Sequence, residues 1–339
     1  MKTGPILNFL GILLMLLGGF MLLPIPWAWY YGEEQAVHFV FSALITVSIG
    51  FLLWKFSSAK AGIQVREGFA IVSLGWLAIA AFGALPFLLT GAIPSVSNAV
   101  FESMSGFTTT GASILSDVEA LPKCVLFWRS FTHWLGGMGI IVFSLAILPI
   151  LGVGGMQLYR TEVAGPTKDK LTPRISQTAQ LLWGIYVLLS ALETVLLWLG
   201  GMNLFDALCH TFGTVATGGF STRNASINAY ENPWIHWVII VFMFLSGTSF
   251  ALHYRALAGK PILYWRSAEF RFYAGAILIA ILFVMASSWS NFASGEAKLR
   301  DAVFVVVSQA TCTGFCTADY ERWSLLAMLI LIIMMFFGG

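Results

Sequence analysis

The sequence predicts an all-α polytopic membrane protein in which two N-terminal helices precede a series of pore-loop repeats. Of its 339 residues, 58% are hydrophobic and only 10% are charged, whereas about 25% of the residues in a soluble protein are charged. Apolar runs of about 20 residues, the length that crosses a bilayer core, recur along the chain. Between them, a polar Thr-Gly segment too short to span a membrane occurs three times.

The N-terminal part supplies two expected spans, at about residues 5–23 and 36–54. The first follows Lys2, as the apolar core of a signal peptide would, but Pro24 and Pro26 stand where a small-residue cleavage site is needed. We therefore expect a retained transmembrane helix.

The rest of the chain alternates spans with short polar segments. Further spans are expected at about 68–90, 124–150, 176–200, 233–254 and 272–289, with a last one that starts near Arg322. The short segments cover 97–113, 205–221 and 301–316. This order predicts four parts, namely the N-terminal helix pair (1–60) and three repeats of span, short helix and span (61–160, 161–262 and 263–339).

The distribution of basic residues predicts the orientation. With the N-terminus in the cytoplasm, 12 of the 18 lysines and arginines lie on the inner side, as the positive-inside rule requires. The three short segments then enter from the outer face. Most acidic residues share that face, either because they concentrate cations there or because they simply avoid the inner side.

The first short segment, 98–113, starts as a helix and ends in Thr108, Thr109, Thr110 and Gly111. Three β-branched residues and a glycine are poor helix formers. Non-helical backbone at membrane depth is tolerated only where protein buries it or where it lines a wet cavity. Cation filters are built from such backbone carbonyls. A Thr-rich turn between helices is the alternative for a single occurrence.

The segment recurs, as Thr217-Gly218 and Thr313-Gly314. A short helical stretch precedes each, and it begins with a small polar or acidic residue followed by alanine, at Asn98, Asp206 and Asp301. An aspartate suits a helix N-terminus because it accepts hydrogen bonds from free N–H groups. Three occurrences at the same topological place favour a filter over a turn.

At these residues the sequence resembles a known family. TTTGAS (108–113), TVATGGFST (214–222) and TCTGF (311–315) are similar to the first three filter segments of the Trk/Ktr/HKT superfamily of cation-translocating proteins. The block at 135–166 resembles bacterial Trk potassium-uptake membrane subunits of the TrkH/TrkG type. The resemblance implies filter carbonyls at Thr108, Thr109, Thr110, Gly111, Val215, Ala216, Thr217, Gly218, Thr311, Cys312, Thr313 and Gly314.

The resemblance also implies a function and partners. It predicts uptake of K+, the transported ion, across the bacterial inner membrane, with no organic cofactor on this chain. In plant members, serine at the first filter glycine goes with sodium permeation, so Gly111 favours potassium. The implied partners are a second copy of the chain in a homodimer, a cytosolic ring of TrkA-like nucleotide-binding subunits and membrane lipid, without nucleic acid. Channel-like conduction and proton symport both remain open.

One departure from the family motivates an alternative function. The family has four repeats, whereas this chain shows three and reaches residue 339 inside the last expected span. A truncated, non-conducting membrane fragment is therefore the alternative to a working pore. A third hypothesis, an intramembrane enzyme, lacks support because the sequence has no evident nucleophile–base pair or set of metal ligands.

Several polar or small residues inside expected spans have open roles. The glycines could allow close helix packing or form gate hinges; they are Gly136, Gly137, Gly139, Gly247, Gly338 and Gly339. Glu193 is either a structural partner of a neighbouring helix or a functional acid. Arg129 could snorkel to headgroups, pair with an acid or line the pore.

Overall fold

The computed structural model describes residues 3–58, 65–139, 175–287 and 295–336. Within these ranges the chain forms helices and loops and no β-strand, which confirms the predicted all-α class. The chain divides into two compact units, Met1–Trp183 and Gly184–Gly339. The unit boundary lies within one long helix, α10 (Ile175–Leu199).

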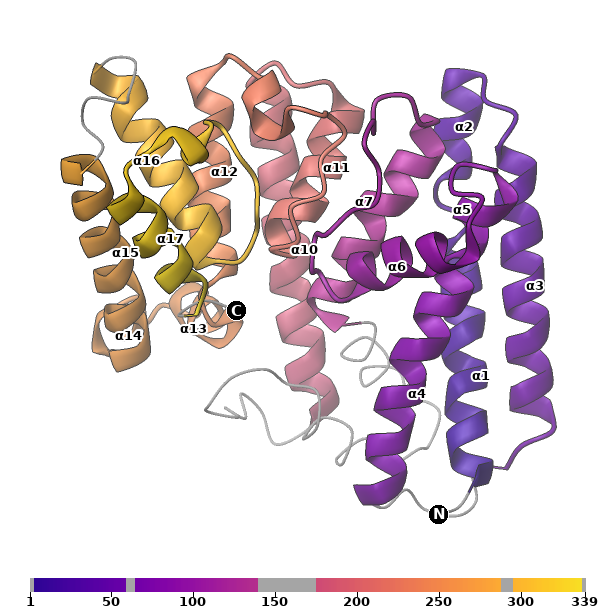
Figure 1. The fold of residues 1–339 in the computed structure, drawn as a ribbon. Helices are drawn as coiled ribbons and strands as arrows, with labels where there is room; N and C mark the ends of the chain where they lie inside the picture. Colours follow the sequence, from indigo (N-terminus) through magenta and orange to yellow (C-terminus); the bar gives the residue numbers. More distant parts are fainter. Residues whose placement is uncertain (1–2, 59–64, 140–174, 288–294, 337–339) are drawn as a thin grey trace. The chain divides into compact units, whose positions relative to one another are not determined.

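The first unit contains the N-terminal helix pair and the first repeat. Its helices are α1 (Thr3–Phe20), α2 (Ile25–Tyr31), α3 (Ala36–Lys55), α4 (Val65–Gly83), α5 (Leu85–Leu89), α6 (Val96–Phe107) and α7 (Lys123–Gly137). Helices α1, α3 and α4 run side by side, whereas the short helix α6 lies across them against α4 and α7 (Figure 1). Helix α6 therefore has the orientation of a re-entrant element.

Helices α1 and α3 pack closely through a pair of glycines. A Cβ atom on Gly11 would lie 2.6 Å from the Gly50 carbonyl oxygen, and one on Gly50 would lie 2.7 Å from the Gly11 carbonyl oxygen. Small residues at such a crossing let two backbones approach each other, which is how helices associate in a membrane. The first two predicted spans thus form one closely packed pair.

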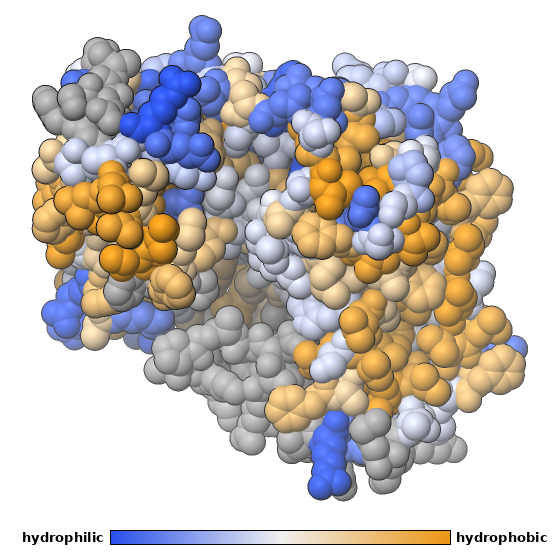
Figure 2. All heavy atoms as spheres, viewed as in Figure 1, coloured by the Kyte–Doolittle hydropathy of each residue, from blue (hydrophilic) through white to orange (hydrophobic). Residues whose placement is uncertain are grey.

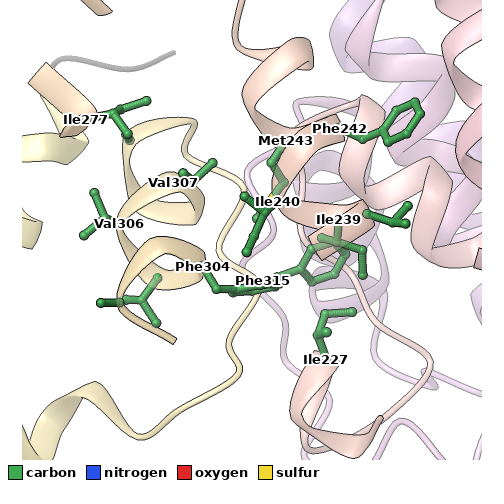
Figure 3. Close-up of a cluster of buried hydrophobic side chains, with 14 of the residues drawn as sticks. Ile227, Ile239, Ile240, Phe242, Met243, Ile277, Phe304, Val306, Val307 and Phe315 are labelled. Atoms are coloured by element: carbon green, nitrogen blue, oxygen red, sulfur yellow. The ribbon is translucent and has the colours of Figure 1, made fainter. Parts of the chain in front are cut away.

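The second unit is built around a central apolar core. Its helices are the C-terminal part of α10, α11 (Leu204–Val215), α12 (Pro233–Ser246), α13 (Phe250–Leu257), α14 (Leu263–Arg266), α15 (Ala268–Ser287), α16 (Gly295–Ala310) and α17 (Leu325–Met335), with 3-10 turns η1 (Ser226–Ala229) and η3 (Tyr320–Arg322). Ile239 and Ile240 of α12 meet Phe304 and Val307 of α16 (Figure 3). Phe315, which follows the third Thr-Gly segment, is buried in the same cluster.

Five helical stretches in the described ranges are long and apolar enough to cross a membrane. They are Thr3–Tyr31, Ala36–Lys55, Arg66–Leu89, Ala179–Leu199 and Ala268–Ser287, close to five of the predicted spans. Apolar side chains cover much of the visible sides of both units, between hydrophilic ends (Figure 2). On α15, for example, Leu278, Leu282 and Phe283 are each more than half exposed, as expected for a lipid-facing surface.

Two sequence predictions need correction. The span predicted at 233–254 is not one continuous helix, because α12 and α13 meet at an angle of 101°. The break falls where Gly247 caps the end of α12 and Ser249 has an extended backbone. The third short helix is also longer than predicted and includes Gly295, six residues before Asp301. The predicted span 124–150 lies outside the described residues beyond Gly139.

Candidate functional site

The first Thr-Gly segment leaves the C-terminal end of α6 without crossing the membrane. Its Thr110 N–H donates to the carbonyl oxygen of Ser105 at 2.9 Å, which keeps the segment close to the end of the helix. Thr109 has a φ angle of 53° and Gly111 one of 76°. The two left-handed residues are thus separated by one residue, Thr110, whose φ is not positive.

The same backbone pattern recurs in both segments of the second unit. The left-handed residues there are Thr217 (φ 52°) and Gly219 (79°), and Cys312 (55°) and Gly314 (82°). In each segment the residue between them donates its N–H to the helix carbonyl five positions earlier, at 2.8 Å. The three short helices thus end in the same structure.

This pattern determines which residues correspond. Residues 216–219 match 108–111 and 311–314, and each set starts ten positions after Asn98, Asp206 or Asp301. Pairing the Thr-Gly dipeptides by sequence placed the second set at 215–218, one residue earlier. Val215 is the last residue of α11, and Gly219, rather than Gly218, has the left-handed conformation of Gly111 and Gly314.

Three of the left-handed residues are not glycines. A left-handed conformation is unfavourable for a residue with a Cβ atom, and most so for β-branched residues such as Thr109 and Thr217. Each such position costs about 1–3 kcal/mol and persists only where the surroundings fix it. Strain repeated at one place in all three segments indicates a functional backbone geometry.

A buried ion pair holds the first segment from behind. Glu102 of α6 is fully buried, and its carboxylate accepts hydrogen bonds from the Ser113 hydroxyl (2.9 Å) and the Ile114 N–H (3.0 Å). The Nε of Arg129, on α7, donates to the same carboxylate at 2.6 Å. Of the three roles open to Arg129, the structure therefore shows pairing with an acid.

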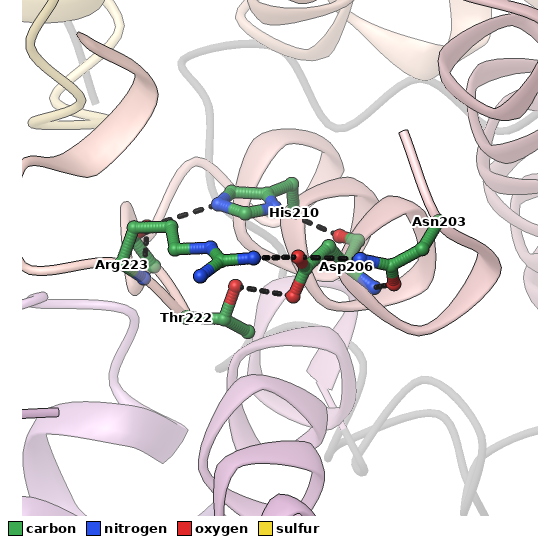
Figure 4. Close-up of polar contacts among 6 residues, drawn as sticks. Asn203, Asp206, His210, Thr222 and Arg223 are labelled. Atoms are coloured by element: carbon green, nitrogen blue, oxygen red, sulfur yellow. Dashed lines mark hydrogen bonds and ion pairs between the residues drawn. The ribbon is translucent and has the colours of Figure 1, made fainter. Parts of the chain in front are cut away.

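The second segment is held by a polar network around Asp206 (Figure 4). Thr222 donates to one carboxylate oxygen of Asp206 at 2.7 Å, and Arg223 donates to the other at 3.0 Å. Asn203 caps α11 by accepting the Asp206 N–H at 2.8 Å. The amide nitrogen of Asn203 also donates to the Asp206 carboxylate at 2.8 Å, so this carboxylate joins the start of the helix to the chain after the segment.

His210 adds a second tie to this network. Its Nδ1 lies 2.8 Å from the Asp206 carbonyl oxygen, and its Nε2 lies 2.9 Å from the Ser221 hydroxyl. A carbonyl oxygen can only accept, so Nδ1 carries the proton and Nε2 accepts from Ser221. Burial lowers the pKa of His210 although Asp206 opposes this effect, and the ring is therefore neutral at pH 7.

The two aspartates at equivalent helix positions differ in their ionisation. Burial alone would raise the pKa of Asp206, but hydrogen bonds from Thr222 and Asn203 and the proximity of His210 bring it below its ordinary value. Asp301 accepts a hydrogen bond from Thr317 at 3.1 Å, and burial raises its pKa. The ionised form is therefore favoured at Asp206 and disfavoured at Asp301.

The third segment is held largely by its neighbour. The Ser308 hydroxyl donates to the Phe315 carbonyl at 2.8 Å. The Cys316 carbonyl accepts the Asn228 N–H at 3.1 Å, and the Cys316 N–H donates to the Ser226 hydroxyl at 3.3 Å. Ser226 and Asn228 belong to the loop that follows the second segment, so these two segments support each other.

Direct backbone packing joins the second and third segments. A Cβ atom on Gly219 would lie 1.9 Å from the Thr313 carbonyl oxygen, whereas one on Gly314 would meet nothing within 4 Å. Gly219 is therefore needed both for its left-handed backbone and for this close approach.

The predicted hinge glycines lie in different environments. A Cβ atom on Gly136 would be 1.9 Å from the Phe107 carbonyl oxygen, and one on Gly247 would be 2.9 Å from Thr311 Cγ2. Both glycines therefore sit against a Thr-Gly segment. Gly137 is exposed, and Gly139 is left-handed with φ 67°. The predictions for Gly338 and Gly339 lie outside the described residues.

Glu193 and the metal-binding side chains complete the list of candidates. Glu193 is fully buried in α10, and its two carboxylate oxygens make no hydrogen bond of normal geometry among the described residues. Within the described ranges, no three His, Cys, Asp or Glu side chains gather to hold a metal ion.

Helical spans with re-entrant helices ending in strained Thr-Gly backbone define a pore-loop class of membrane transport protein. Comparison with known proteins gives the family. The TrkH family, described as cation transport proteins, matches residues 34–339. The chain belongs to this family.

Similar proteins include curated relatives and one solved structure. The Trk system potassium uptake protein TrkH of Salmonella typhimurium is 42% identical over 345 aligned positions, which cover 100% of this chain and 71% of the relative. The TrkG protein of Escherichia coli K12 is 36% identical over 97% of this chain and 69% of its own length. The crystal structure of the potassium transporter TrkH from Vibrio parahaemolyticus matches with a TM-score of 0.85 at 36% identity, covering 98% of this chain and 70% of that one.

Proposed function

We propose that the protein takes up K+ through a pore whose selectivity filter includes the backbone carbonyls of residues 108–111, 216–219 and 311–314. The observation that carries the proposal is the repeated alternation of left-handed and ordinary residues in all three segments. Such alternation turns successive carbonyl oxygens toward one side, where they can replace the hydration shell of a cation. The printed names of the relatives, potassium uptake proteins, support K+ as the ion.

The short helices supply a second electrostatic contribution. Helices α6, α11 and α16 each end directly at a segment, so the negative ends of their dipoles, of about half a unit charge each, lie next to it. These partial charges stabilise a dehydrated cation without a carboxylate ligand. The membrane potential drives uptake with about 2.3 kcal/mol per charge per 100 mV.

The proposal includes a location and partners. We place the protein in the bacterial inner membrane with its N-terminus in the cytoplasm, because this orientation puts the basic loop residues inside. Arg255 of α13, Lys260, Arg266 of α14 and Arg271 near the start of α15 belong to one such connection between spans. A homodimer bound to a TrkA-like ring of nucleotide-binding subunits is the assembly that the family resemblance implies, and it would gate the pore. A pull-down with the ring subunit, before and after neutralising these four charges, tests the docking.

Uptake measurements test the function itself. The protein is expressed from its own gene in cells that lack other K+-uptake systems, and growth at low K+ is compared with an empty vector. We expect growth and K+ accumulation. Absence of both, despite confirmed membrane insertion, would favour the alternative of a non-conducting polypeptide. Proton flux recorded together with uptake separates channel-like conduction from symport.

Two neighbouring glycines provide a sharper test of the filter. Serine at Gly219 should weaken discrimination of K+ over Na+ strongly, because a side chain there meets the Thr313 carbonyl oxygen. Serine at Gly218, whose φ is not left-handed, should have a smaller effect. If the Gly218 variant were the more damaging one, the earlier register at 215–218 would be the better assignment. Unchanged discrimination in both variants would refute the filter.

A further inference from the structure

We propose that Glu102 and Arg129 are positioning residues that determine how strictly the first filter segment selects K+ over Na+. The inference rests on the proposed filter function and adds to it a specificity-determining pair outside the carbonyl ligands. Neither side chain belongs to residues 108–111, so neither would be expected to touch the ion. Instead, they determine the positions of the backbone carbonyl oxygens of residues 108–111.

The contacts of Glu102 show how this would work. One carboxylate oxygen accepts from both the Ser113 hydroxyl (2.9 Å) and Arg129 Nε (2.6 Å), and the other accepts from the Ile114 N–H (3.0 Å). Ser113 and Ile114 come just after Gly111 in the chain. Since α6 holds the start of the segment and Glu102 holds the chain beyond it, the four filter residues are fixed at both ends.

Arg129 fixes the carboxylate in turn. Its guanidinium comes from α7 and is almost fully buried, as is Glu102. A carboxylate with no solvent around it has few other ways to satisfy its oxygens, and charged hydrogen bonds are short and directional. A buried ion pair adds little stability compared with well-packed apolar residues. The pair instead contributes a fixed geometry of the segment, which a filter requires because selectivity depends on the positions of its carbonyl oxygens.

The other two segments support this interpretation by contrast. The position of Glu102, six residues before the segment, is taken by His210 in the second repeat and by Val305 in the third. His210 holds Ser221, the counterpart of Ser113, with one neutral hydrogen bond. Val305 offers no polar group, and the Ser226 hydroxyl from the neighbouring loop bonds Cys316 there instead. A charged side chain at this position occurs only in the first of the three segments; in the other two, carboxylates from the equivalent positions Asp206 and Asp301 hold Thr222 and Thr317 instead.

The test compares the ratio of K+ to Na+ uptake among variants at matched membrane levels. Glu102→Gln removes the charge but keeps the shape, and Arg129→Gln removes the partner. The matched control is Glu296→Gln, which breaks an ion pair with Arg300 one helix turn away, where the carboxylate is exposed. We expect the ratio to fall about tenfold in the first two variants, the loss of one charged hydrogen bond, and to stay unchanged in the control.

A second variant covers the case in which the charge variants do not accumulate. Ser113→Ala removes a single hydrogen bond to Glu102 and leaves the ion pair, so it should fold and lower the ratio by about threefold. Thermal unfolding in detergent is measured in parallel. A loss of thermal stability with an unchanged ratio in these variants would overturn the proposal, because the pair would then be only structural.

The Gly219→Ser variant distinguishes a failure of the positioning role from a failure of the filter assignment. If it changes the ratio while the Glu102, Arg129 and Ser113 variants do not, the filter stands and the positioning role is refuted. If none of the variants changes the ratio, the filter assignment itself fails and the positioning role fails with it.

Discussion

The first filter segment and the two in the second unit follow the same backbone path but are supported differently. Behind the first, a buried carboxylate and a guanidinium from a spanning helix hold the chain. The second uses a neutral histidine and an aspartate network, and the third relies on the loop of its neighbour. In each case, the residues that hold the segment belong to the same unit as the segment.

This contrast separates the features that the proposed filter function requires from those that vary. The left-handed residues two apart and the hydrogen bond between them occur in all three segments, while the residues that hold them vary in charge, polarity and origin. A carbonyl filter needs one backbone geometry, and several kinds of side chain can stabilise it. A substitution that disturbs only the left-handed backbone should therefore act alike in all segments, whereas one that also disturbs a supporting contact or a neighbouring segment should not.

The largest effect is expected from filling the close contact at Gly219. In Gly219→Ala, the new methyl group would lie 1.9 Å from the Thr313 carbonyl oxygen and would force a left-handed alanine. The two penalties together come to about 2–5 kcal/mol, enough to lower uptake strongly. Gly314→Ala has open space and should lose only about 1–2 kcal/mol. Thermal unfolding and Rb+ uptake measure both, and equal effects in the two variants would contradict the packing.

The next largest effect concerns the ion pair. Arg129→Gln leaves Glu102 buried without its charged partner, and should lower the free energy of unfolding by about 3–5 kcal/mol. The double variant Glu102→Gln/Arg129→Gln removes both charges and should recover part of this loss. A double-mutant cycle by thermal unfolding gives the coupling. Additive losses would show that the two side chains do not interact.

A smaller effect is expected where α7 packs on the first segment. Gly136→Ala places a methyl group against the Phe107 carbonyl oxygen, immediately before Thr108, and should cost about 1–3 kcal/mol together with some discrimination against Na+. Gly137→Ala, on the exposed side of the same helix, should change stability by no more than about 0.5 kcal/mol. A reversed order would indicate a hinge at Gly137 instead of close packing at Gly136.

The smallest expected effect is a pH dependence in the second segment. Burial lowers the pKa of His210 below its ordinary value of about 6.5, so below that pH the unfolded chain binds a proton that the folded chain does not. Stability therefore falls as the pH falls, by up to about 1.4 kcal/mol per pH unit from this group. His210→Gln should flatten the decline, whereas Ser221→Ala should weaken the fold but keep the slope. Identical slopes in wild type and His210→Gln would rule out this role.

The sequence predicts the helical class and most spans because apolar length and basic loops are local signals. It also predicts the three short helices, through their polar first residues at Asn98, Asp206 and Asp301. Counting ten residues from Asn98, Asp206 and Asp301 aligns 216–219 with the other two segments, as the backbone does. Matching the Thr217-Gly218 dipeptide to the other Thr-Gly pairs is the simpler alignment of the sequence, and it gives 215–218 instead.

Other features depend on contacts that no local pattern contains. Glu102 and Arg129 are 27 residues apart, and only the crossing of α6 with α7 brings them together. The break at residues 247–249 lies within a run that hydropathy scores as one span, and the structure places Gly247 beside Thr311 there. Three of the six extra residues at the start of α16 are charged (Glu296, Lys298 and Arg300), so the stretch does not read as part of an apolar helix.

Anomalous diffraction from crystals grown with Tl+, a K+ substitute, tests the central claim most directly. The account predicts Tl+ within coordination distance of carbonyl oxygens from residues 216–219 and 311–314, and loss of that signal when Na+ replaces Tl+. Tl+ bound only at side-chain carboxylates, with none at these carbonyls, would contradict the assignment of the segments as an ion filter.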